Sequence, residues 1–439
     1  MDETRRARWS TPAEPDAAHV AELQRLAADA GVQRALALLQ RRAGEITELQ
    51  IEFARLPSPD ARAPLRAALL GRVLESAGVQ ALRVDAAGNV IGFVRGAGGS
   101  ASEDRRVVVL SAHLDTVFPE LAHIEIERDG DVLRGPGIAD DAAGLAAIVH
   151  LAGVLCARGI PLRHDIAVVG TVGEEGEGDL RGVKHLFASE LAPDRVAAFI
   201  TLDLGDPEEI VHGGIGSRRL RATVHGPGGH SWGDFGRPNP IHALARGLDR
   251  FLAAVPSGNA RSSYNVGVVE GGRGVNVIPE SASARVDLRS ESAAELEELE
   301  SVFRACIEAG VGAERAWSRA GADALRLELE VIGDRPAGTT PADSDLVRTA
   351  VAAFGNGNLR VRLGASSTDA NEPMRLGVPA LALPHGVRAH ETHSRREWCN
   401  VGARVPVLEA VLLALLCVAG GASMPPPPAP GDDGRPRRR

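Results

Sequence analysis

The sequence predicts an α/β protein whose mainly parallel sheet is flanked by helices and carries an inserted α+β module. Short apolar runs, typical of buried strands, alternate with segments of helical periodicity on both sides of the insertion. Between residues 217 and 332 the patterns follow the order strand, helix, strand, strand, helix, strand, which is that of a ferredoxin-like fold. A chain of 439 residues is also too long for one ordinary core, so two modules are expected.

The first part of the main module is expected over residues 31–216. Apolar residues three and four positions apart predict helices between residues 32 and 77. Residues 1–30 are mixed and charged, and they are expected to form an arm or a frayed helix. Two hairpins, three buried strands and two helices are then predicted, in chain order, at 82–94, 106–110, 124–133, 142–158, 166–170, 182–190 and 196–202.

The same patterns predict the inserted module and the second part of the main module, residues 333–423. The inserted module is expected to have strands and helices at 218–224, 240–254, 263–269, 281–288, 293–309 and 325–331. The chain then completes the main module with elements at 360–363, 369–376 and 380–384, and with a buried terminal helix inside 405–420. Residues 424–439 are rich in proline and arginine and are expected to be disordered.

Composition argues against several classes of function. The formal net charge is −9, so neither nucleic acid nor an anionic membrane is expected as a partner. Lys184 is the only lysine and lies in no glycine-rich phosphate loop, which argues against P-loop and Schiff-base chemistry. The four cysteines lie far apart, a spacing typical of a reducing compartment. With no signal-peptide pattern and no membrane-length apolar run, the protein is expected in the cytoplasm.

The adjacent carboxylates of Glu174 and Glu175 are the first sign of a functional site. They follow the predicted strand 166–170 in a glycine-rich loop, Gly-Glu-Glu-Gly at 173–176. In a cleft of low dielectric constant, two such carboxylates repel each other unless a cation lies beside them. Since the chain has one lysine, a metal ion is the first candidate. A solvated acidic loop is the structural alternative.

Other polar residues follow neighbouring predicted strands. His113 and Asp115 come after strand 106–110, Asp203 comes after strand 196–202, and Asp140 precedes helix 142–158. Ligands bind beyond the carboxyl ends of the strands in open parallel sheets, so these side chains are expected to converge. Each has a structural alternative, such as a helix cap, a turn residue or a buried core histidine. Together they favour a site for a divalent metal ion.

The order of these motifs resembles a known family. The runs Ser-Ala-His-Leu-Asp at 111–115, Gly-Ile-Ala-Asp-Asp at 137–141 and Gly-Glu-Glu-Gly at 173–176, with Asp203 and His393, are similar to those of the co-catalytic dizinc metallopeptidases. That family includes peptidase T, carboxypeptidase G, acetylornithine deacetylase and succinyl-diaminopimelate desuccinylase. The resemblance covers residues 49–418 and implies a zinc-exopeptidase-like fold with an inserted lid or dimerisation module.

The resemblance implies two divalent metal ions, zinc in the first place with manganese or cobalt as alternatives. The implied ligands are His113, Asp140, Glu175, Asp203 and His393, with Asp140 bridging the two ions. Glu174 would be the general base, and Asp115 would orient the His113 ring through its second nitrogen. His390 competes with His393 for the last position, and Glu397, four residues after His393, favours His393.

Three residues of the inserted module have implied roles. His230, in the run Gly-Pro-Gly-Gly-His-Ser, would stabilise the oxyanion, often from the partner subunit. Asn276 and Arg289 would hold polar groups and the terminal carboxylate of a substrate. The structural alternatives are a glycine-rich surface turn for His230 and an exposed charge for Arg289. Residues 364–369 follow a predicted strand and are expected either to line the cleft or to form a core turn.

The motifs and the resemblance together predict a metal-dependent amide or peptide hydrolase. An exopeptidase acting on dipeptides or tripeptides is preferred, because Asp203 stands where the deacylases commonly have glutamate and so resembles the peptidase T side. An N-acyl or N-carbamoyl amino acid amidohydrolase and a non-catalytic metal-binding relative are the alternatives. A homodimer through the inserted module is expected. Ala142 replaces a lysine of many relatives, which affects none of the metal ligands.

Overall fold

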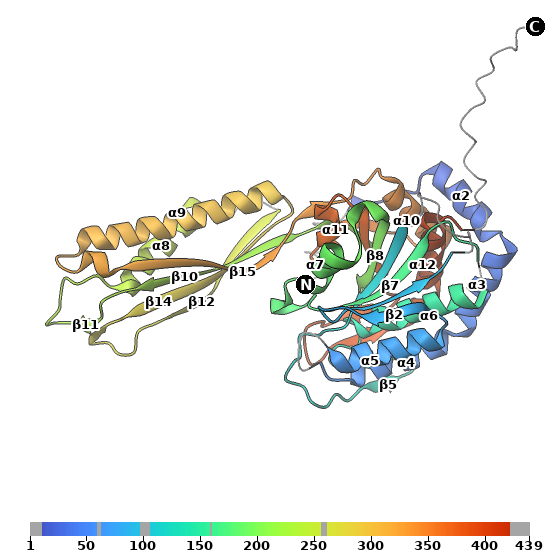
Figure 1. Cartoon of the computed structure of the whole chain (residues 1–439), viewed down its shortest axis with the longest axis horizontal. Coiled ribbons are helices and arrows are strands. Elements are labelled where there is room, and N and C mark those ends of the chain that lie inside the picture. The colour runs from blue at the N-terminus through green and yellow to red at the C-terminus, as the bar shows by residue number, and fades with distance from the viewer. Residues whose placement is uncertain (1–10, 59–62, 97–105, 159, 256–260, 422–439) are drawn as a thin grey trace, which may run out of the picture.

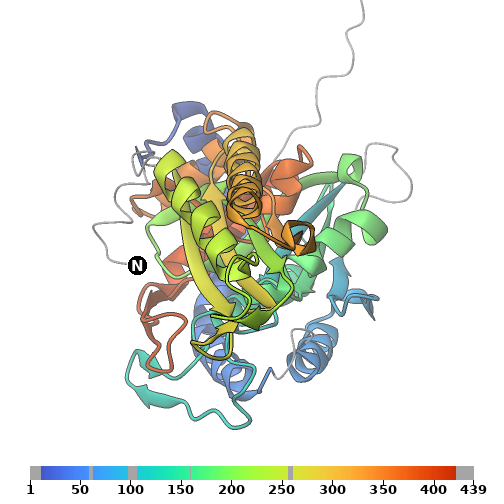
Figure 2. The ribbon, with the colours of Figure 1, turned by 90° about the vertical axis from the view of Figure 1, so that its left-hand side faces the viewer.

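The computed structural model shows two modules joined by a pair of strands (Figure 1). The main module is built from both ends of the chain, and the inserted module, residues 216–335, projects from it (Figures 1 and 2). The structure describes residues 11–58, 63–96, 106–158, 160–255 and 261–421. The expected disorder of residues 424–439 concerns a segment outside this range. Within it, no helix is both long and apolar enough to cross a membrane.

The central sheet of the main module is parallel at its centre and antiparallel towards its edges. The neighbouring strands β18, β8, β4 and β7 run parallel, which confirms the predicted fold class. The strands lie in the order β1 (Thr11–Pro12), β17 (Arg362–Ser366), β9 (Glu209–Gly214), β18 (Ala380–Pro384), β8 (Val196–Leu204), β4 (Val107–His113), β7 (Asp165–Thr171), β3 (Val90–Val94) and β2 (Gln80–Val84), with β16 (Gly338–Thr339) beside β9.

Helices cover both faces of this sheet because alternate strand residues point to opposite sides. Leu110 and Val168 belong to the larger core, whereas Val109 and Val169 belong to the smaller one. The larger core is formed with α2 (Ala17–Ala27), α3 (Ala30–Arg41), α4 (Ala43–Arg55), α5 (Pro64–Ser76), α6 (Ala142–Arg158), α10 (Asp345–Asn356) and α12 (Arg404–Val418). The smaller core is formed with α7 (Arg181–His185), the π-helical turn Leu186–Glu190 that continues it, and α11 (Asn371–Arg375).

The inserted module is a four-stranded antiparallel sheet covered by two helices. Its strand order, β12-β14-β10-β15, is that of the ferredoxin-like arrangement. The elements are β10 (Gly216–His225), α8 (Pro240–Ala254), β12 (Ser262–Gly271), β14 (Ser281–Ser290), α9 (Ala293–Trp317) and β15 (Arg326–Arg335). β10 and β15 extend to residues 216 and 335, slightly beyond the expected bounds 217 and 332, and they form the connection to the main module.

Smaller elements complete the architecture. β11 (Gly229–His230) pairs with β13 (Val277–Ile278) at the end of the inserted module that lies away from the main module (Figure 1). A separate sheet contains β19 (Arg388–His390), β20 (Trp398–Asn400), β6 (Val132–Arg134) and β5 (Glu127–Asp129). Short 3₁₀ turns lie at Gly176–Gly178, Pro193–Arg195 and Ala322–Ala324.

Several predicted elements require correction. Residues 1–30 were expected to form an arm or a frayed helix, and their described part contains the regular helix α2, which begins after the capping residue Asp16 and buries Leu23 and Leu26. α9 continues to Trp317, eight residues past the predicted end at 309. Strand β9 and helix α10 were not predicted, because β9 is short and ends in glycines and α10 follows a turn-rich stretch.

Candidate metal-dependent active site

Adjacent parallel strands bring the first site residues together. His113 ends β4 and lies in register with Thr171, the last residue of β7. The backbone N–H of Leu114 donates to the Thr171 carbonyl at 2.7 Å, so the loops after the two strands leave the sheet side by side. Asp203 lies inside β8, the strand on the other side of β4. It was expected just after that strand. Its position in the ladder fixes the direction of its side chain.

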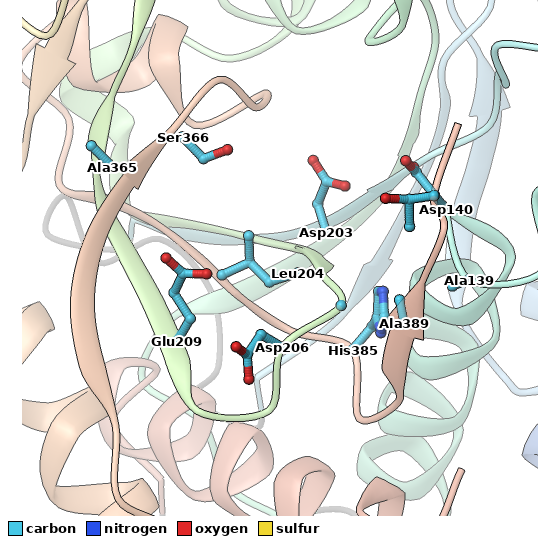
Figure 3. A pocket seen from close by; sticks show the side chains of 12 residues that line it. Ala139, Asp140, Asp203, Leu204, Asp206, Glu209, Ala365, Ser366, His385 and Ala389 are labelled. Carbon is cyan, nitrogen blue, oxygen red and sulfur yellow. The ribbon is translucent and has the colours of Figure 1, made fainter. Parts of the chain in front are cut away.

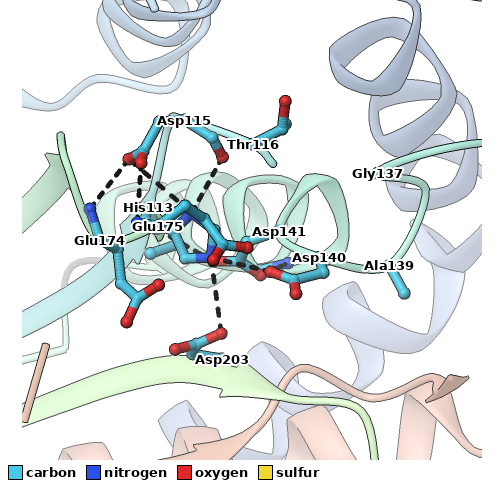
Figure 4. Close-up of polar contacts among 12 residues, drawn as sticks. His113, Asp115, Thr116, Gly137, Ala139, Asp140, Asp141, Glu174, Glu175 and Asp203 are labelled. Carbon is cyan, nitrogen blue, oxygen red and sulfur yellow. Dashed lines mark hydrogen bonds and ion pairs between the residues drawn. The ribbon is translucent and has the colours of Figure 1, made fainter. Parts of the chain in front are cut away.

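Asp140 is the centre of the cluster. It lies just before α6, and each of its carboxylate oxygens faces a different histidine. Oδ1 is 2.9 Å from Nε2 of His113, and Oδ2 is 2.9 Å from Nε2 of His393. His113 Nε2 is also 3.6 Å from Asp203 Oδ1, and His393 Nε2 is 3.1 Å from Glu175 Oε1. Figure 4 shows His113 among the carboxylates of Asp140, Glu175 and Asp203. The Asp140 carboxylate thus lies between two groups of side chains, His113 with Asp203 and His393 with Glu175.

The structure distinguishes the two candidate histidines near residue 390. His393 contacts Asp140 and Glu175, whereas the His390 ring stacks on Trp398 at 4.0 Å between ring centroids. His393 has a φ of 63°, a left-handed backbone conformation that is unfavourable for a residue other than glycine. The fold tolerates this conformation at the position that directs an imidazole into the cluster.

The Asp115 carboxylate holds the loop that carries the paired glutamates. It accepts hydrogen bonds from the backbone N–H groups of Gly173 at 2.7 Å, Glu174 at 3.2 Å and Glu175 at 2.9 Å (Figure 4). The His113 ring nitrogen Nδ1 instead contacts the Asp115 backbone carbonyl at 3.0 Å, and the carboxylate is 4.0 Å away. Asp115 thus contacts the second ring nitrogen of His113 through its main-chain carbonyl.

Two further buried carboxylates hold backbone near the ligands. Glu397 accepts from the N–H groups of Gly137 at 3.0 Å, Ala139 at 2.7 Å and Asp140 at 3.1 Å. Asp141 accepts from the His113 N–H at 3.0 Å. Burial, and next the nearby Asp140 charge, raise the pKa of Glu397 to about 7. These contacts hold in place the loops that carry His113 and Asp140.

The electrostatics of the cluster favour bound cations. Burial alone lowers the pKa of His113, but hydrogen bonds to Asp140 and Asp203 raise it well above its usual value. Asp140 and Glu175 raise the pKa of His393 to about 11. Burial raises the pKa of both Glu175 and Asp203. The neighbouring carboxylates thus favour positive charge at this place, and divalent ions bound among these side chains would satisfy the same negative charges.

The side chains present fit divalent metal ions. Ligand atoms of His113, Asp140 and Glu175 all lie within 4.8 Å of one another, and the same holds for His113, Glu174 and Asp203. Imidazole nitrogen and carboxylate oxygen are the donors that zinc and similar ions take in catalytic sites. All four cysteines are unpaired and lie outside both groups, so no thiolate competes for the ions.

Glu174 is buried and contacts a residue that sequence reasoning did not single out. Its Oε1 is 3.2 Å from Nη1 of Arg335, and its backbone carbonyl accepts from Nη2 of the same arginine. The two side chains are only 7% and 8% exposed. Burial raises the pKa of Glu174 well above its usual range, and the Arg335 guanidinium opposes that rise. The contact with Arg335 was not predicted from the sequence, and the role of Glu174 as general base stays a prediction.

Among the described residues, no hydrogen bond or ion pair joins His230, Asn276 or Arg289 to the cluster. His230 and Asn276 lie near β11 and β13, at the far end of the module (Figure 1). The His230 Nδ1 accepts from the N–H groups of Trp232 and Gly233 at 3.2 Å. Arg289 lies at the opposite end, in register with Ser217 near the connection, where its Nε donates to Asp287 at 2.7 Å.

Comparison with known proteins decides the family. A family model described as peptidase family M20/M25/M40 matches residues 109–416, well over half of the chain. The chain belongs to this peptidase family. The M20 assignment confirms the resemblance inferred from the motifs, and it makes the protein a metal-dependent hydrolase.

Relatives of this M20-family chain have several activities in their names. It is 30% identical over 323 residues to a putative succinyl-diaminopimelate desuccinylase of Mycobacterium tuberculosis, a match covering 70% of this chain and 82% of the relative. Carboxypeptidase G2 of a Pseudomonas species is 28% identical over 208 residues, which covers 46% of this chain and 47% of the relative.

Solved structures share the M20 fold. Aminopeptidase PepT of Bacillus cereus superposes with a TM-score of 0.69 at 21% identity, covering 86% of this chain and 99% of that chain. A dinuclear metal binding peptidase of Bacillus subtilis superposes with a TM-score of 0.64 at 15% identity, covering 87% and 100%. At these identities the likeness shows a shared fold.

Sequence reasoning missed two parts of this M20-family site. Arg335 lies in the run Gly-Asp-Arg-Pro at 333–336, which was noted only as the end of the inserted module. A single arginine at a module boundary belongs to no periodic pattern, so no pattern in the sequence indicated a role for Arg335. Glu397 was noted for its spacing from His393, but its three backbone contacts depend on the pairing of β20 with β6, which brings distant segments together.

Proposed function

We propose that the protein is an exopeptidase that hydrolyses dipeptides or tripeptides with two zinc ions held by His113, Asp140, Glu175, Asp203 and His393. The observation that carries this proposal is the Asp140 carboxylate, which presents one oxygen to each of two ligand groups at 2.9 Å from a histidine nitrogen. Manganese or cobalt would suit the same oxygen and nitrogen donors.

The bound ions would supply the polarisation of the scissile carbonyl and the acidification of the attacking water. Glu174 would accept the proton of that water and return it to the leaving amine. Its carboxylate has an oxygen within 4.8 Å of ligand atoms of His113 and Asp203, so it lies next to the first ligand group. Asp115 would keep Glu174 in this place through the loop N–H contacts.

Arg335 would orient Glu174 without reacting itself. Its Nη1 also lies 3.2 Å from the Ser367 hydroxyl, so the guanidinium has a fixed position between the base and the loop 364–369. A carboxylate held on one side by a cation presents its other oxygen in a defined direction. We assign Arg335 to positioning for this reason.

A homodimer through the inserted module would complete the site. His230 is exposed at the far end of its own chain, and its Nδ1 is already occupied by two backbone N–H groups. Its Nε2 would be the nitrogen offered to an oxyanion in the partner subunit. The edge strand β12 and the exposed Trp232 and Val275 beside His230 support an interface at this module. Asn276 and Arg289 would contact polar groups of the substrate.

An N-acyl or N-carbamoyl amidohydrolase is the second candidate. It is favoured by the relative named as a desuccinylase and by structural neighbours named as hydantoinase/carbamoylase family amidases. For localisation we propose the cytoplasm, on the basis of four unpaired cysteines. Fractionation of cells that express the protein would test that assignment.

The decisive experiment compares metal content and turnover in matched variants. Purified protein should hold two divalent ions per chain by elemental analysis and should hydrolyse short peptides in a chelator-sensitive way. Glu174→Gln should keep the metal and lower kcat by about 10²- to 10⁴-fold. Glu177→Gln, in the same loop but exposed, should leave kcat unchanged. A Glu174→Gln enzyme as active as the wild type would refute the assignment of the base.

A further inference from the structure

A second group of possible metal ligands lies outside the catalytic cluster. It consists of Asp85, which follows β2, and of His185 and Glu190, the last residues of α7 and of the π-helical turn after it. The ligand atoms of these three side chains all lie within 4.8 Å of one another. The described residues that line the cavity beside Asp140 and Asp203 include none of the three (Figure 3). The group is therefore separate from the proposed active site.

The π-helical turn explains how two of the ligands come to lie together. In a regular α-helix, residues five positions apart point in directions that differ by about 140°. In a π-helical turn the hydrogen bonds join residues five apart, as the N–H of Leu191 shows by donating to the Leu186 carbonyl at 2.9 Å. Residues at this spacing then lie nearer to one side. His185 and Glu190 have this spacing, and π-helical turns are rare and frequent at functional sites.

Asp85 is held in place before any ligand arrives. Its Oδ1 accepts from the N–H groups of Ala87, Gly88 and Asn89 at 2.9 Å, and its Oδ2 accepts from the Asn89 side chain at 2.7 Å. Oδ2 lies 4.0 Å from Nε2 of His185, which is too long for a hydrogen bond. Two ligand atoms on a tetrahedral zinc ion lie about 3.3 Å apart. A small movement of the imidazole would therefore let both side chains bind one ion.

Glu190 already has a partner, and a bound ion would share the carboxylate with it. Arg83 donates to Glu190 Oε2 from Nε at 3.2 Å and from Nη2 at 2.7 Å. Their side chains are 40% and 23% exposed, and ion pairs in such positions contribute little to stability. Both contacts use one oxygen of a carboxylate that has about four acceptor positions. Asp85, Glu190 and Arg83 together carry a net charge of −1, so the group still attracts a cation.

We propose that Asp85, His185 and Glu190 bind a divalent ion of the zinc class, in addition to the ions of the proposed active site. One imidazole nitrogen and two carboxylate oxygens form a donor set that zinc takes, with water as the fourth ligand. Calcium and magnesium prefer sets made of oxygen alone, so the histidine selects against them. This site takes no part in the proposed hydrolysis, and the inference does not rest on that function.

An ion at this site would stabilise the segment that carries the proposed base. Asn89, which holds Asp85, also donates from its Nδ2 to the Gly182 carbonyl at 2.9 Å. Its Oδ1 accepts from the N–H of Val172 at 3.1 Å, two residues before Glu174. The ion would join the β2–β3 hairpin to α7, on either side of these contacts. Its expected effect is on the stability of the native fold.

The test counts zinc ions in matched variants. Wild type, His185→Gln and Glu190→Gln are dialysed to equilibrium against a series of free zinc concentrations and analysed for metal. Wild type should hold one ion per chain more than either variant. His123→Gln, at a histidine with an 83% exposed side chain outside the group, should match the wild type.

Equal zinc contents of the wild type and the two variants at every concentration would overturn the proposal. A wild type that holds a single ion, lost in His185→Gln, would support this site and contradict the dinuclear active site. The two proposals can therefore fail separately.

Thermal unfolding gives a second reading. Zinc should raise the Tm of the wild type by about 2 °C more than that of His185→Gln, because an ion that binds only the folded protein stabilises it. The ions of the active site contribute to both proteins alike, so the difference reports the second site. Equal shifts would overturn the stabilising role. The same difference with calcium in place of zinc would overturn the assignment to the zinc class.

Discussion

Arg335, on the strand that returns from the inserted module, contacts the carboxylate of Glu174 in the main module at 3.2 Å. The same junction has further contacts, since the Asp334 N–H donates to Asp179 at 2.7 Å and Lys184 donates to the Asp334 carbonyl at 2.7 Å. The loop of the proposed base is therefore attached to the connection between the two modules. A substitution at this junction is therefore expected to alter the position of Glu174 and the rate of hydrolysis.

Arg335→Met should shift the pH dependence of hydrolysis. Without the guanidinium, burial raises the pKa of Glu174 further, so a larger fraction of the base is protonated at neutral pH. We expect the acid limb of kcat/KM to move to higher pH and the rate at pH 7 to fall by about ten- to a hundredfold. Arg335→Lys keeps the charge and should show a smaller shift. An unchanged acid limb in the methionine variant would contradict a positioning role.

Glu397→Gln should weaken metal binding without removing a ligand. The glutamate accepts hydrogen bonds from three backbone N–H groups around Asp140. In glutamine an NH₂ group replaces one of the two acceptor oxygens, so a donor would face a backbone donor. A loss of about 10- to 100-fold in metal affinity is expected, the usual effect of such supporting residues. Competition with a chromophoric chelator would measure it. Glu391→Gln, on the same segment and exposed, should bind metal as the wild type does.

Mixing two inactive variants should restore activity if His230 acts across a dimer. Co-expressed Glu174→Gln and His230→Ala chains would form mixed dimers in which one site has both an intact base and an intact partner histidine. About a quarter of the wild-type activity is expected from statistical mixing in a twofold dimer. Sedimentation would establish the dimer first. No recovery in a proven mixed dimer would assign His230 to its own chain or to no catalytic role.

Asp369 should make the metal-free protein less stable as the pH rises. Burial raises the pKa of this carboxyl from 3.8 to about 7, so the folded protein binds more protons there between those values. The contribution of Asp369 to the free energy of unfolding therefore falls between about pH 4 and pH 7, by about 4 kcal/mol at most, and is constant above that range. Urea unfolding of the wild type and Asp369→Asn across this range would measure the difference. Parallel pH dependences for the two proteins would contradict the assignment.

Much of the fold was predictable because its signals are local. α6, fully apolar along most of its length, and α8, which begins with an Asn239 cap and Pro240, were predicted at their observed bounds. β9 was missed because a strand of six residues ending in two glycines resembles a turn. β9 is a strand because it pairs with β17 and β18, and this pairing cannot be predicted from the residues next to β9 in the sequence.

The cluster was predictable to the extent that its residues follow strands. His113 and Glu175 could be placed at one sheet edge because parallel neighbours end together. The contact of Arg335 with Glu174 joins residues 161 positions apart. Such contacts depend on the packing of segments that are distant in the sequence, so no local sequence pattern predicts them.

The single lysine gives the protein a natural point for chemical labelling. Lys184 is about one third exposed, and its ammonium lies 2.8 Å from Asp179 and 2.7 Å from the Asp334 carbonyl. Apart from the amino terminus, an amine-reactive dye has no other side chain to modify. A fluorophore attached there would sit at the joint between the two modules and would report their relative movement during turnover, without any engineered residue.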